Sequence, residues 1–478
     1  MIILRHFQYD PSEGIIMGNQ KIHCTGASMN KDNTQQSAPA KIDVVRSDLE
    51  SHWMPFTDNK SFKDDPRLVV KGEGVYLWNQ HGDRLLDGSS GLFTAAAGHC
   101  RPEITAAVAE QLAELDYIPS FLRSHPRSFE LANKLCPILP KPMNHVFFCN
   151  SGSEAVDSAI KIVLQYHACR GEGQRNIFVS RDRAYHGVNV GGTSLSGLVK
   201  NRVGFNGMMP GVVHMRATWD EDQRFSRGQP QHRGVELAND LHRFVSTHGA
   251  KSIAACFIEP IAGSTGVLVP PVGYLERIRE ICDENDIIMV MDEVLTGFGR
   301  TGAAFASDAF QVVPDILTMA KALTNGAQPM GAVAVKDEIY DTIMNASPRD
   351  IVEFAHGYTY SAHPAACAAA IATLEIYENE NLFERANNMS EYFLDSMFAL
   401  QNLAVVTDIR GYGMLAGFDI APQGGVGVRG NQLQKRLFDA GLHIKTTGDA
   451  GIIAPPLTVK KEQIDEMCEI LKQELNRL

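Results

Sequence analysis

Asp315-Ile-Leu-Thr-Met-Ala-Lys321 is an apolar run that ends at a lysine, and Ile287-Ile-Met-Val-Met-Asp292-Glu-Val294 is a second run, whose apolar part ends at an aspartate. Short apolar runs of this kind are typical of strands that are buried on both faces of a parallel sheet. In open sheets of this class, ligands lie beyond the carboxyl ends of the strands. The two runs therefore predict that Lys321 and Asp292 lie near each other at a ligand-binding edge.

Five further runs of the same kind lie between about residues 102 and 336, with helical or loop-rich segments between them. Together they predict an α/β fold whose large domain is built on a mainly parallel, seven-stranded sheet covered by helices on both faces. The seven runs are 145–148, 176–180, 212–215, 253–258, 287–291, 316–319 and 332–335.

Size and composition restrict the class of function. The 478 residues carry a net charge of -12 and are 44% apolar, with no basic cluster and no long uncharged apolar stretch. This composition argues against nucleic-acid binding and against a membrane span, and favours small-molecule chemistry. The nine cysteines are scattered and include no Cys-x-x-Cys pair, which indicates reduced thiols in a cytoplasmic protein.

Residues 1–40 differ from the remainder, because they lack apolar periodicity and include a polar stretch at 30–36. We expect a flexible N-terminal extension there. Met17 and Met29 leave the translation start open.

Reactive residues follow five of the seven runs, so the predicted sheet brings them to one edge. Each of them alone has an ordinary structural explanation, but their common location does not. They are Ser151, Gly152 and Ser153 after the first run, Tyr185 and His186 after the second, Glu259 after the fourth, Asp292 at the end of the fifth and Lys321 after the sixth.

These residue types suit pyridoxal phosphate. Lys321 supplies an amine that can bond to the cofactor aldehyde and then move a proton, and Asp292 can keep the pyridine nitrogen protonated. Tyr185 can stack on the ring. Gly152 and Ser153 open a predicted helix whose N-terminus can bind the phosphate, although Ser151 and the glutamate three residues later also form a capping-box pattern.

Two other motif matches indicate no function. Residues 297–302 match G-x-G-x-x-G but follow two carboxylates, which would repel a pyrophosphate. Residues 158–161 match S-x-x-K inside a helix without a second motif. No histidine lies in an H-E-x-x-H pattern, so no metal site is predicted.

From about Trp53 to its C-terminus, the chain resembles the class III pyridoxal-phosphate aminotransferases of fold type I. Within them it is most similar to the ω-amino acid:pyruvate (β-alanine:pyruvate) branch. The resemblance rests on Asn150-Ser-Gly-Ser-Glu-Ala155, Tyr185-His-Gly187, Asp292-Glu-Val-Leu-Thr-Gly-Phe-Gly-Arg300, Lys321, His52-Trp-Met-Pro-Phe-Thr57, Ala262-Gly-Ser-Thr-Gly-Val-Leu-Val-Pro270 and His356-Gly-Tyr-Thr-Tyr-Ser361.

The resemblance implies a large cofactor-binding domain over residues 101–365. It also implies a smaller α/β domain, formed by residues 41–100 together with 366–478. His186, Glu259 and Val294 would contact the cofactor, with Val294 packing behind the ring. Membership further implies a homodimer, or a dimer of dimers, in which Thr359 reaches the cofactor phosphate of the neighbouring subunit.

The implied reaction transfers an amino group from an ω-amino acid or primary amine to pyruvate by ping-pong kinetics. Arg410 matches the family's arginine for a substrate carboxylate, and its planar group suits bidentate binding. Relatives often carry a glutamate that pairs with this arginine, at the position where this chain has Ser264. The candidates for the pocket wall are Trp53, Phe56, Leu92 and Phe93.

The donor stays open on sequence alone. A diamine or γ-aminobutyrate aminotransferase and an aminomutase are the alternatives, because one fold supports several fates of the same cofactor.

Overall fold

The computed structural model describes residues 16–17, 20–21, 39, 41–205 and 208–478. The chain divides into two units, residues 1–38 and 39–478. In the first unit, the described residues form an antiparallel pair, β1 (Ile16–Met17) and β2 (Gln20–Lys21). Apart from these four residues and residue 39, the predicted flexible extension, residues 1–40, lies outside the described residues.

A seven-stranded sheet is the centre of the second unit, and each strand coincides with one of the predicted apolar runs. Its order is β6-β12-β11-β10-β9-β7-β8, and only β12 runs antiparallel to its neighbours. The mainly parallel sheet is thereby confirmed. The strands are β6 (Met143–Cys149), β7 (Ile177–Arg181), β8 (Val212–Met215), β9 (Ile253–Ile258), β10 (Ile288–Asp292), β11 (Ile316–Met319) and β12 (Gly331–Lys336).

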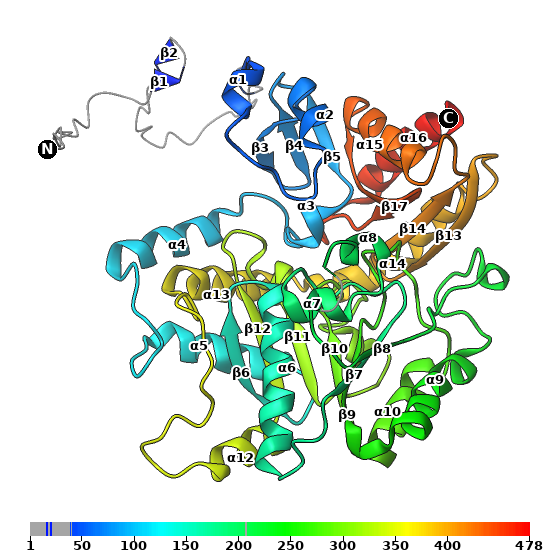
Figure 1. Ribbon diagram of the computed structural model, residues 1–478. Coiled ribbons are helices and arrows are strands. Elements are labelled where there is room, and N and C mark those ends of the chain that lie inside the picture. Colours follow the sequence, from blue (N-terminus) through cyan, green and yellow to red (C-terminus); the bar gives the residue numbers. More distant parts are fainter. Residues whose placement is uncertain (1–15, 18–19, 22–38, 40, 206–207) are drawn as a thin grey trace, which may run out of the picture. The chain divides into compact units, whose positions relative to one another are not determined.

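The central strands of this sheet are buried on both faces, which is why β9, β10 and β11 are almost entirely apolar. Successive residues of β10 alternate between two hydrophobic clusters: Ile288 and Val290 pack with residues of α6 and α12, whereas Met289 and Met291 pack with residues of α9 and α10. This alternation is the two-residue period of a strand. Figure 1 shows α6 in front of the sheet and α9 and α10 beside β9.

The helices around the large sheet begin and end as follows: α4 (Pro102–Glu114), α5 (Pro126–Leu135), α6 (Gly152–Cys169), α7 (Val190–Leu195), α8 (Val199–Arg202), α9 (Gly234–His248), α10 (Tyr274–Asn285), α11 (Ala306–Ala309), α12 (Asp337–Ala346) and α13 (Pro364–Asn379). The other helices are α1 (Arg46–Leu49), α2 (Asn59–Asp64), α3 (Ser90–Phe93), α14 (Leu382–Phe398), α15 (Val428–Asp439) and α16 (Lys461–Asn476), and the 3-10 turns are η1 (Cys136–Ile138), η2 (Glu221–Gln223), η3 (Ala250–Ser252) and η4 (Lys321–Thr324).

Two smaller sheets join the ends of the chain. One has the order β15-β5-β4-β3, so that β15 (Leu442–His443) from the C-terminal segment pairs in parallel with β5 (Arg84–Asp87) from the N-terminal segment. The α/β fold with a smaller part built from both terminal segments therefore holds. The exact boundaries predicted at residues 100 and 365 stay a prediction. The remaining strands are β3 (Val69–Glu73), β4 (Tyr76–Asn79), β13 (Val406–Tyr412), β14 (Leu415–Ile420), β16 (Lys445–Thr447) and β17 (Ala450–Ile453).

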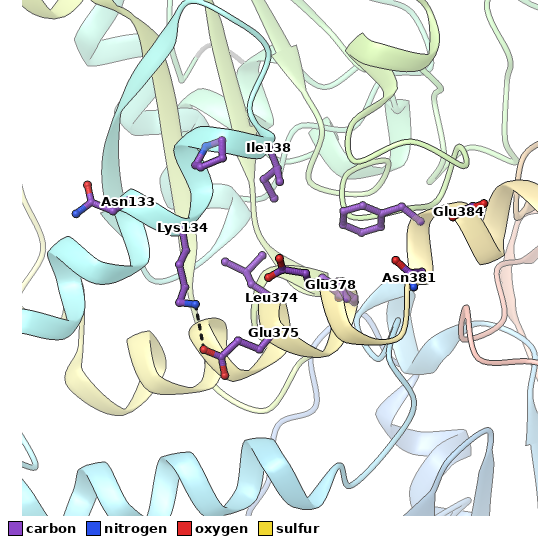
Figure 2. Close-up of a pocket in the computed structure, with 11 residues that line it drawn as sticks. Asn133, Lys134, Ile138, Leu374, Glu375, Glu378, Asn381 and Glu384 are labelled. Carbon is purple, nitrogen blue, oxygen red and sulfur yellow. Dashed lines mark ion pairs between the residues drawn. The ribbon is translucent and has the colours of Figure 1, made fainter.

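A surface groove of about 530 Å³ lies between α5 and the C-terminal half of α13. Figure 2 shows Lys134 and Glu375 joined across it, with 3.0 Å between the ammonium nitrogen and the carboxylate. Tyr377, in the wall of the groove, is buried and donates from its hydroxyl to the carbonyl of Ala322 at 2.7 Å. The groove therefore borders the back of the turn that begins at Lys321.

In the part of the chain from residue 41 onward that the structure describes, no helix is both long and apolar enough to cross a membrane.

Candidate active site

The structure brings Lys321 and Asp292 to the same edge of the large sheet. β10 and β11 pair in parallel with Asp292 opposite Thr318, and Lys321 begins η4 two residues after β11 ends. The backbone of Lys321 is left-handed, with φ of 47°. Such a conformation is uncommon for a residue with a side chain, and it is found at functional sites more often than elsewhere.

The environment of Lys321 favours a reactive amine. Burial lowers the pKa of Lys321, while the nearby carboxylates of Asp292 and Glu259 act in the opposite direction. Only a deprotonated amine is nucleophilic, so a lowered pKa increases the reactive fraction near neutral pH. The amine nitrogen lies 5.7 Å from the centre of the Phe93 ring.

Asp292 is nearly buried and is held from three directions. One carboxylate oxygen lies 2.8 Å from Nδ1 of His186. The other accepts from the Thr318 hydroxyl and from the Val294 backbone N–H, both at 3.2 Å. Fixed partners orient a carboxylate toward a ligand before the ligand binds. Thr318 was not predicted as a site residue, although it is the one polar residue within the run 316–319.

Glu259 positions the loop that carries Tyr185. Its two carboxylate oxygens accept from the backbone N–H groups of Tyr185 at 2.8 Å and Gly263 at 3.2 Å. Burial, together with the nearby charge of Asp292, raises the pKa of Glu259. Through these contacts Glu259 connects the segment that follows β7 with the segment that follows β9.

The N-terminus of α6 faces the same place. Ser151 caps the helix, because its hydroxyl accepts from the Glu154 N–H at 3.2 Å. The Glu154 carboxylate accepts from the Asn150 N–H at 2.7 Å. In the usual capping box this carboxylate accepts from the N-cap residue itself, which here is Ser151. The N–H groups of Gly152 and Ser153 have no acceptor within the helix, as in every first turn. They remain able to bind an anion.

One cavity unites these groups. Its lining consists of Gly152, Ser153, Tyr185, His186, Gly187, Glu259, Ser264, Asp292, Val294, Leu295 and Lys321.

The residues present fit a phosphorylated pyridine aldehyde. An amine and an oriented carboxylate face one cavity beside an aromatic ring, with a helix N-terminus at its edge. A Cβ atom at residue 152 would lie only 2.8 Å from Val294 Cγ1, so glycine leaves the space in which backbone N–H groups can approach a ligand. Lys321, Asp292, Tyr185, Gly152 and Ser153 are the residues that would hold such a group.

Comparison with known proteins agrees with this geometry. The family model described as aminotransferase class-III matches residues 59–475. The chain belongs to the class-III aminotransferases. It is therefore a pyridoxal-phosphate-dependent aminotransferase, as the sequence predicted. An ω-aminotransferase of Caulobacter vibrioides is 46% identical, over 91% of this chain and 99% of that protein. A β-alanine–pyruvate aminotransferase of Pseudomonas aeruginosa is 45% identical, over 90% and 96% of the two chains.

Solved aminotransferases share the fold as well. An ω-transaminase of Pseudomonas jessenii in complex with PMP is 32% identical and superposes with a TM-score of 0.86, covering 91% of this chain and 98% of that one. A thermostable (S)-enantioselective ω-transaminase of Thermomicrobium roseum is 34% identical with a TM-score of 0.85, at the same coverage.

Not every predicted residue lines the aminotransferase cavity of the single chain. Thr359 is exposed, and its carbonyl accepts from the Tyr117 hydroxyl at 2.9 Å. Trp53 and Phe56 are 89% and 75% exposed, and Leu92 is half exposed. Phe93 alone among the predicted wall residues is buried and near Lys321.

A strained loop holds Phe93 in that place. Ser90 and Phe93 both have left-handed backbones, with φ of 49° and 63°. Arg300, fully buried, donates to the Ser90 hydroxyl at 2.7 Å, and Asp87 accepts from the Gly91 N–H at 2.6 Å. Buried partners of this kind can offset the cost of a strained backbone.

Arg410 is buried and paired with carboxylates. Its guanidinium donates to Asp408 at 2.6 Å and to both oxygens of Asp419 at 2.8 and 2.9 Å. β13 and β14 thus supply acidic partners for Arg410, in a chain that has Ser264 at the position of the relatives' glutamate.

Proposed function

We propose that this aminotransferase moves an amino group from an ω-amino acid or primary amine to pyruvate, giving alanine and an aldehyde or semialdehyde. The observation that carries the proposal is the convergence of Lys321, Asp292 and Tyr185 on one cavity. The names of the similar proteins from Caulobacter vibrioides and Pseudomonas aeruginosa support the choice of substrates.

Lys321, Asp292 and Tyr185 each have a different role in the proposed reaction. When bound, pyridoxal phosphate supplies an aldehyde that takes up the amino group and a ring that accepts an electron pair. Lys321 Nζ would bond to the cofactor aldehyde in the resting enzyme, with loss of water, and, once displaced by the donor amine, would move a proton from and to the substrate carbon. Asp292 would keep the ring nitrogen protonated by opposite-charge stabilisation, and Tyr185 would stack on the ring.

We also propose a homodimer, or a dimer of dimers, that completes the site. The exposure of Thr359 agrees with a contact to the phosphate in a neighbouring subunit. Trp53, Phe56 and Leu92, which are exposed in the single chain, would form the donor wall once a second subunit covers them. We assign the protein to the cytoplasm, since the eight cysteines of the described residues are free thiols.

A donor panel with pyruvate tests the proposed reaction. With ¹⁵N-labelled β-alanine, γ-aminobutyrate, putrescine and an aryl amine, we expect the label in alanine, and parallel lines in initial-rate plots of donor against pyruvate. Label retained in a rearranged donor would identify an aminomutase instead. Transfer to an acceptor other than pyruvate would contradict the proposal, and the fastest donor decides among ω-amino acid, diamine and γ-aminobutyrate enzymes.

Replacing Arg410 with alanine tests the carboxylate site. We expect the KM for pyruvate to rise roughly 10- to 100-fold, because hydrogen bonds to a charged partner are each worth about 1.5–3 kcal/mol. The KM for an acceptor without a carboxylate, such as an aliphatic aldehyde, should change little. The ratio of the two KM values within one variant is insensitive to the fraction of folded protein. An unchanged ratio would show that Arg410 has only a structural role.

A further inference from the structure

Helix α6 holds the loop that carries Thr359. Ser158 is fully buried in α6, and its hydroxyl oxygen lies 2.8 Å from Nε2 of His356. Three residues further along the helix, Nζ of Lys161 lies 3.3 Å from Nδ1 of the same ring. The S-x-x-K match at residues 158–161 indicated no acylation chemistry. Both of its side chains instead contact His356, which lies three residues before Thr359.

The hydrogen bonds of His356 run in one direction. An ammonium group can only donate, so Nδ1 of His356 accepts from Lys161. Burial, and next the positive charge of Lys161, lower the pKa of His356 to about 4, so that the ring is neutral at neutral pH. The single ring proton is then on Nε2, and Nε2 donates to the Ser158 hydroxyl.

The Ser158 hydroxyl continues this chain of hydrogen bonds toward the start of α6. It donates to the Tyr358 hydroxyl at 3.4 Å, and that hydroxyl donates to the Glu154 carbonyl, also at 3.4 Å. Both distances are long for hydroxyl donors, so each of these two bonds alone is weak. Each hydroxyl nevertheless has a donor and an acceptor, and in such a chain every bond supports the next.

Aromatic packing holds the same segment independently of the hydrogen bonds. The His356 ring stacks on Phe147 of β6, with 5.3 Å between the ring centres and 13° between the ring planes. The rings of Phe354 and Tyr358 stand edge-on to it, with centres 5.3 and 5.0 Å away. These are favourable arrangements of aromatic pairs. His356 is therefore the residue at which α6, β6 and the loop meet.

The backbone around Thr359 is held on both sides. The Thr359 carbonyl accepts from the Tyr117 hydroxyl at 2.9 Å, and the Ser361 carbonyl accepts from the Ser120 hydroxyl at 3.1 Å. Within the loop, the backbone N–H of Tyr358 donates to the Ser361 hydroxyl at 3.1 Å. The loop thus presents an exposed threonine on an ordered backbone, which lowers the cost of ordering when that threonine binds.

The N-terminus of the same helix borders the cofactor cavity. Gly152 and Ser153 line the cavity, and Glu154 follows them directly. Ser158 lies five residues after Ser153, about 8 Å along the helix axis. Helix α6 therefore carries the predicted phosphate-binding groups of its own chain at one point and the anchor of the Thr359 loop one turn later.

We propose that Ser158, His356 and Tyr358 are positioning residues, which hold the loop for a contact that it makes in the neighbouring subunit. In that contact Thr359 reaches the cofactor phosphate, so the inference rests on the proposed dimer. Loss of the Ser158 hydroxyl removes the acceptor of His356 and the donor to Tyr358. The cofactor site that suffers is then the one in the other chain.

Hybrid dimers test the inference, because they separate the effects of the two chains. One chain of each dimer carries Lys321→Ala, so that only the other chain can be joined covalently to pyridoxal phosphate. In the first hybrid, Ser158→Ala is on the chain without the lysine. In the second hybrid, Ser158→Ala is on the chain that keeps the lysine. Each dimer is freed of cofactor and titrated with pyridoxal phosphate. Borohydride reduction and mass spectrometry then measure the tagged fraction of Lys321, without any turnover.

We expect the half-saturating concentration of pyridoxal phosphate to rise about 5-fold in the first hybrid, the usual effect of losing one hydrogen-bond partner. In the second hybrid, the threonine comes from a chain with an intact Ser158. Its half-saturating concentration should stay within about 2-fold of that of a hybrid without Ser158→Ala. A purely structural loss would affect both hybrids alike, or the second one more, and either result would overturn the inference.

The matched control is Ser396→Ala in α14, where the hydroxyl donates to the Tyr392 carbonyl at 2.9 Å within the helix. It should shift neither hybrid. If Ser158→Ala does not fold, Tyr358→Phe removes the next hydroxyl of the chain, and the same contrast between the two hybrids is expected. Equal values for the two Tyr358→Phe hybrids would overturn the inference.

Thr359→Ala in the same two arrangements separates this inference from the proposed dimer. If Thr359→Ala leaves the first hybrid unchanged, the proposed contact across the interface fails, and the positioning role fails with it. If Thr359→Ala raises the half-saturating concentration in the first hybrid while Ser158→Ala does not, only the positioning role fails.

Discussion

Lys321→Ala should reduce alanine formation from an amine and pyruvate by a factor on the order of 10⁴ or more. General acid–base catalysis alone contributes 10²–10⁴-fold, and this variant also loses the covalent bond to the cofactor. Lys321 begins a turn and has a left-handed backbone conformation. Alanine at this position must adopt the same conformation but lacks the amine. Alanine formation, followed as ¹⁵N transfer, is the measurement.

Lys445 provides an internal control for this experiment. Burial, together with the charge of nearby Lys200, lowers the pKa of Lys445, so it is a second lysine whose pKa is lowered. Borohydride reduction of the cofactor-loaded parent enzyme, followed by peptide mapping, should leave the tag on Lys321 alone. A tag on Lys445, or a Lys321→Ala variant that retains more than a tenth of the activity, would contradict the assignment.

Asp292→Asn should lower the rate by about 10²–10³-fold, the usual cost of removing one oriented electrostatic group from an active site. Asparagine has nearly the same shape, but it carries no negative charge to keep the ring nitrogen protonated. The contacts of Asp292 to Thr318 and Val294 need only an acceptor oxygen, which an amide retains. We therefore expect little change in thermal stability, measured by calorimetry beside the rate.

The control for this variant is Asp308→Asn, a change of the same chemistry at an exposed position of α11. It should leave the rate within about 2-fold of the parent enzyme, as is usual for surface substitutions. A rate for Asp292→Asn within 3-fold of the parent would show that the carboxylate charge is not used in the reaction.

The large sheet and its active edge could be predicted because both depend on local patterns. A strand that is buried on both faces must be apolar along its whole length, so 253–258 and 287–291 were recognisable at once. A parallel sheet then brings the residues that follow its strands to one edge. Lys321, Asp292, Glu259 and Tyr185 lie there because each follows such a run.

The partners of these residues could not be predicted in the same way. The contact of His186 with Asp292, and that of Tyr377 with the turn at Lys321, join segments whose separation in the sequence carries no signal. The motif around Arg410 was recognisable, but its pairing with Asp419 on a neighbouring strand was not. A carboxylate on a strand reads as a solvated side chain until the strand across from it is known.

The sequence by itself determined the class of sheet, the edge at which chemistry takes place and the lysine and aspartate that serve it, because burial and strand period act along the chain. Only the tertiary structure decided how each of these groups is held, and where Arg410 rests relative to the cavity. Hydrogen bonds and ion pairs depend on distances of about 3 Å between atoms from different elements. Such distances exist only once the strands and helices have packed.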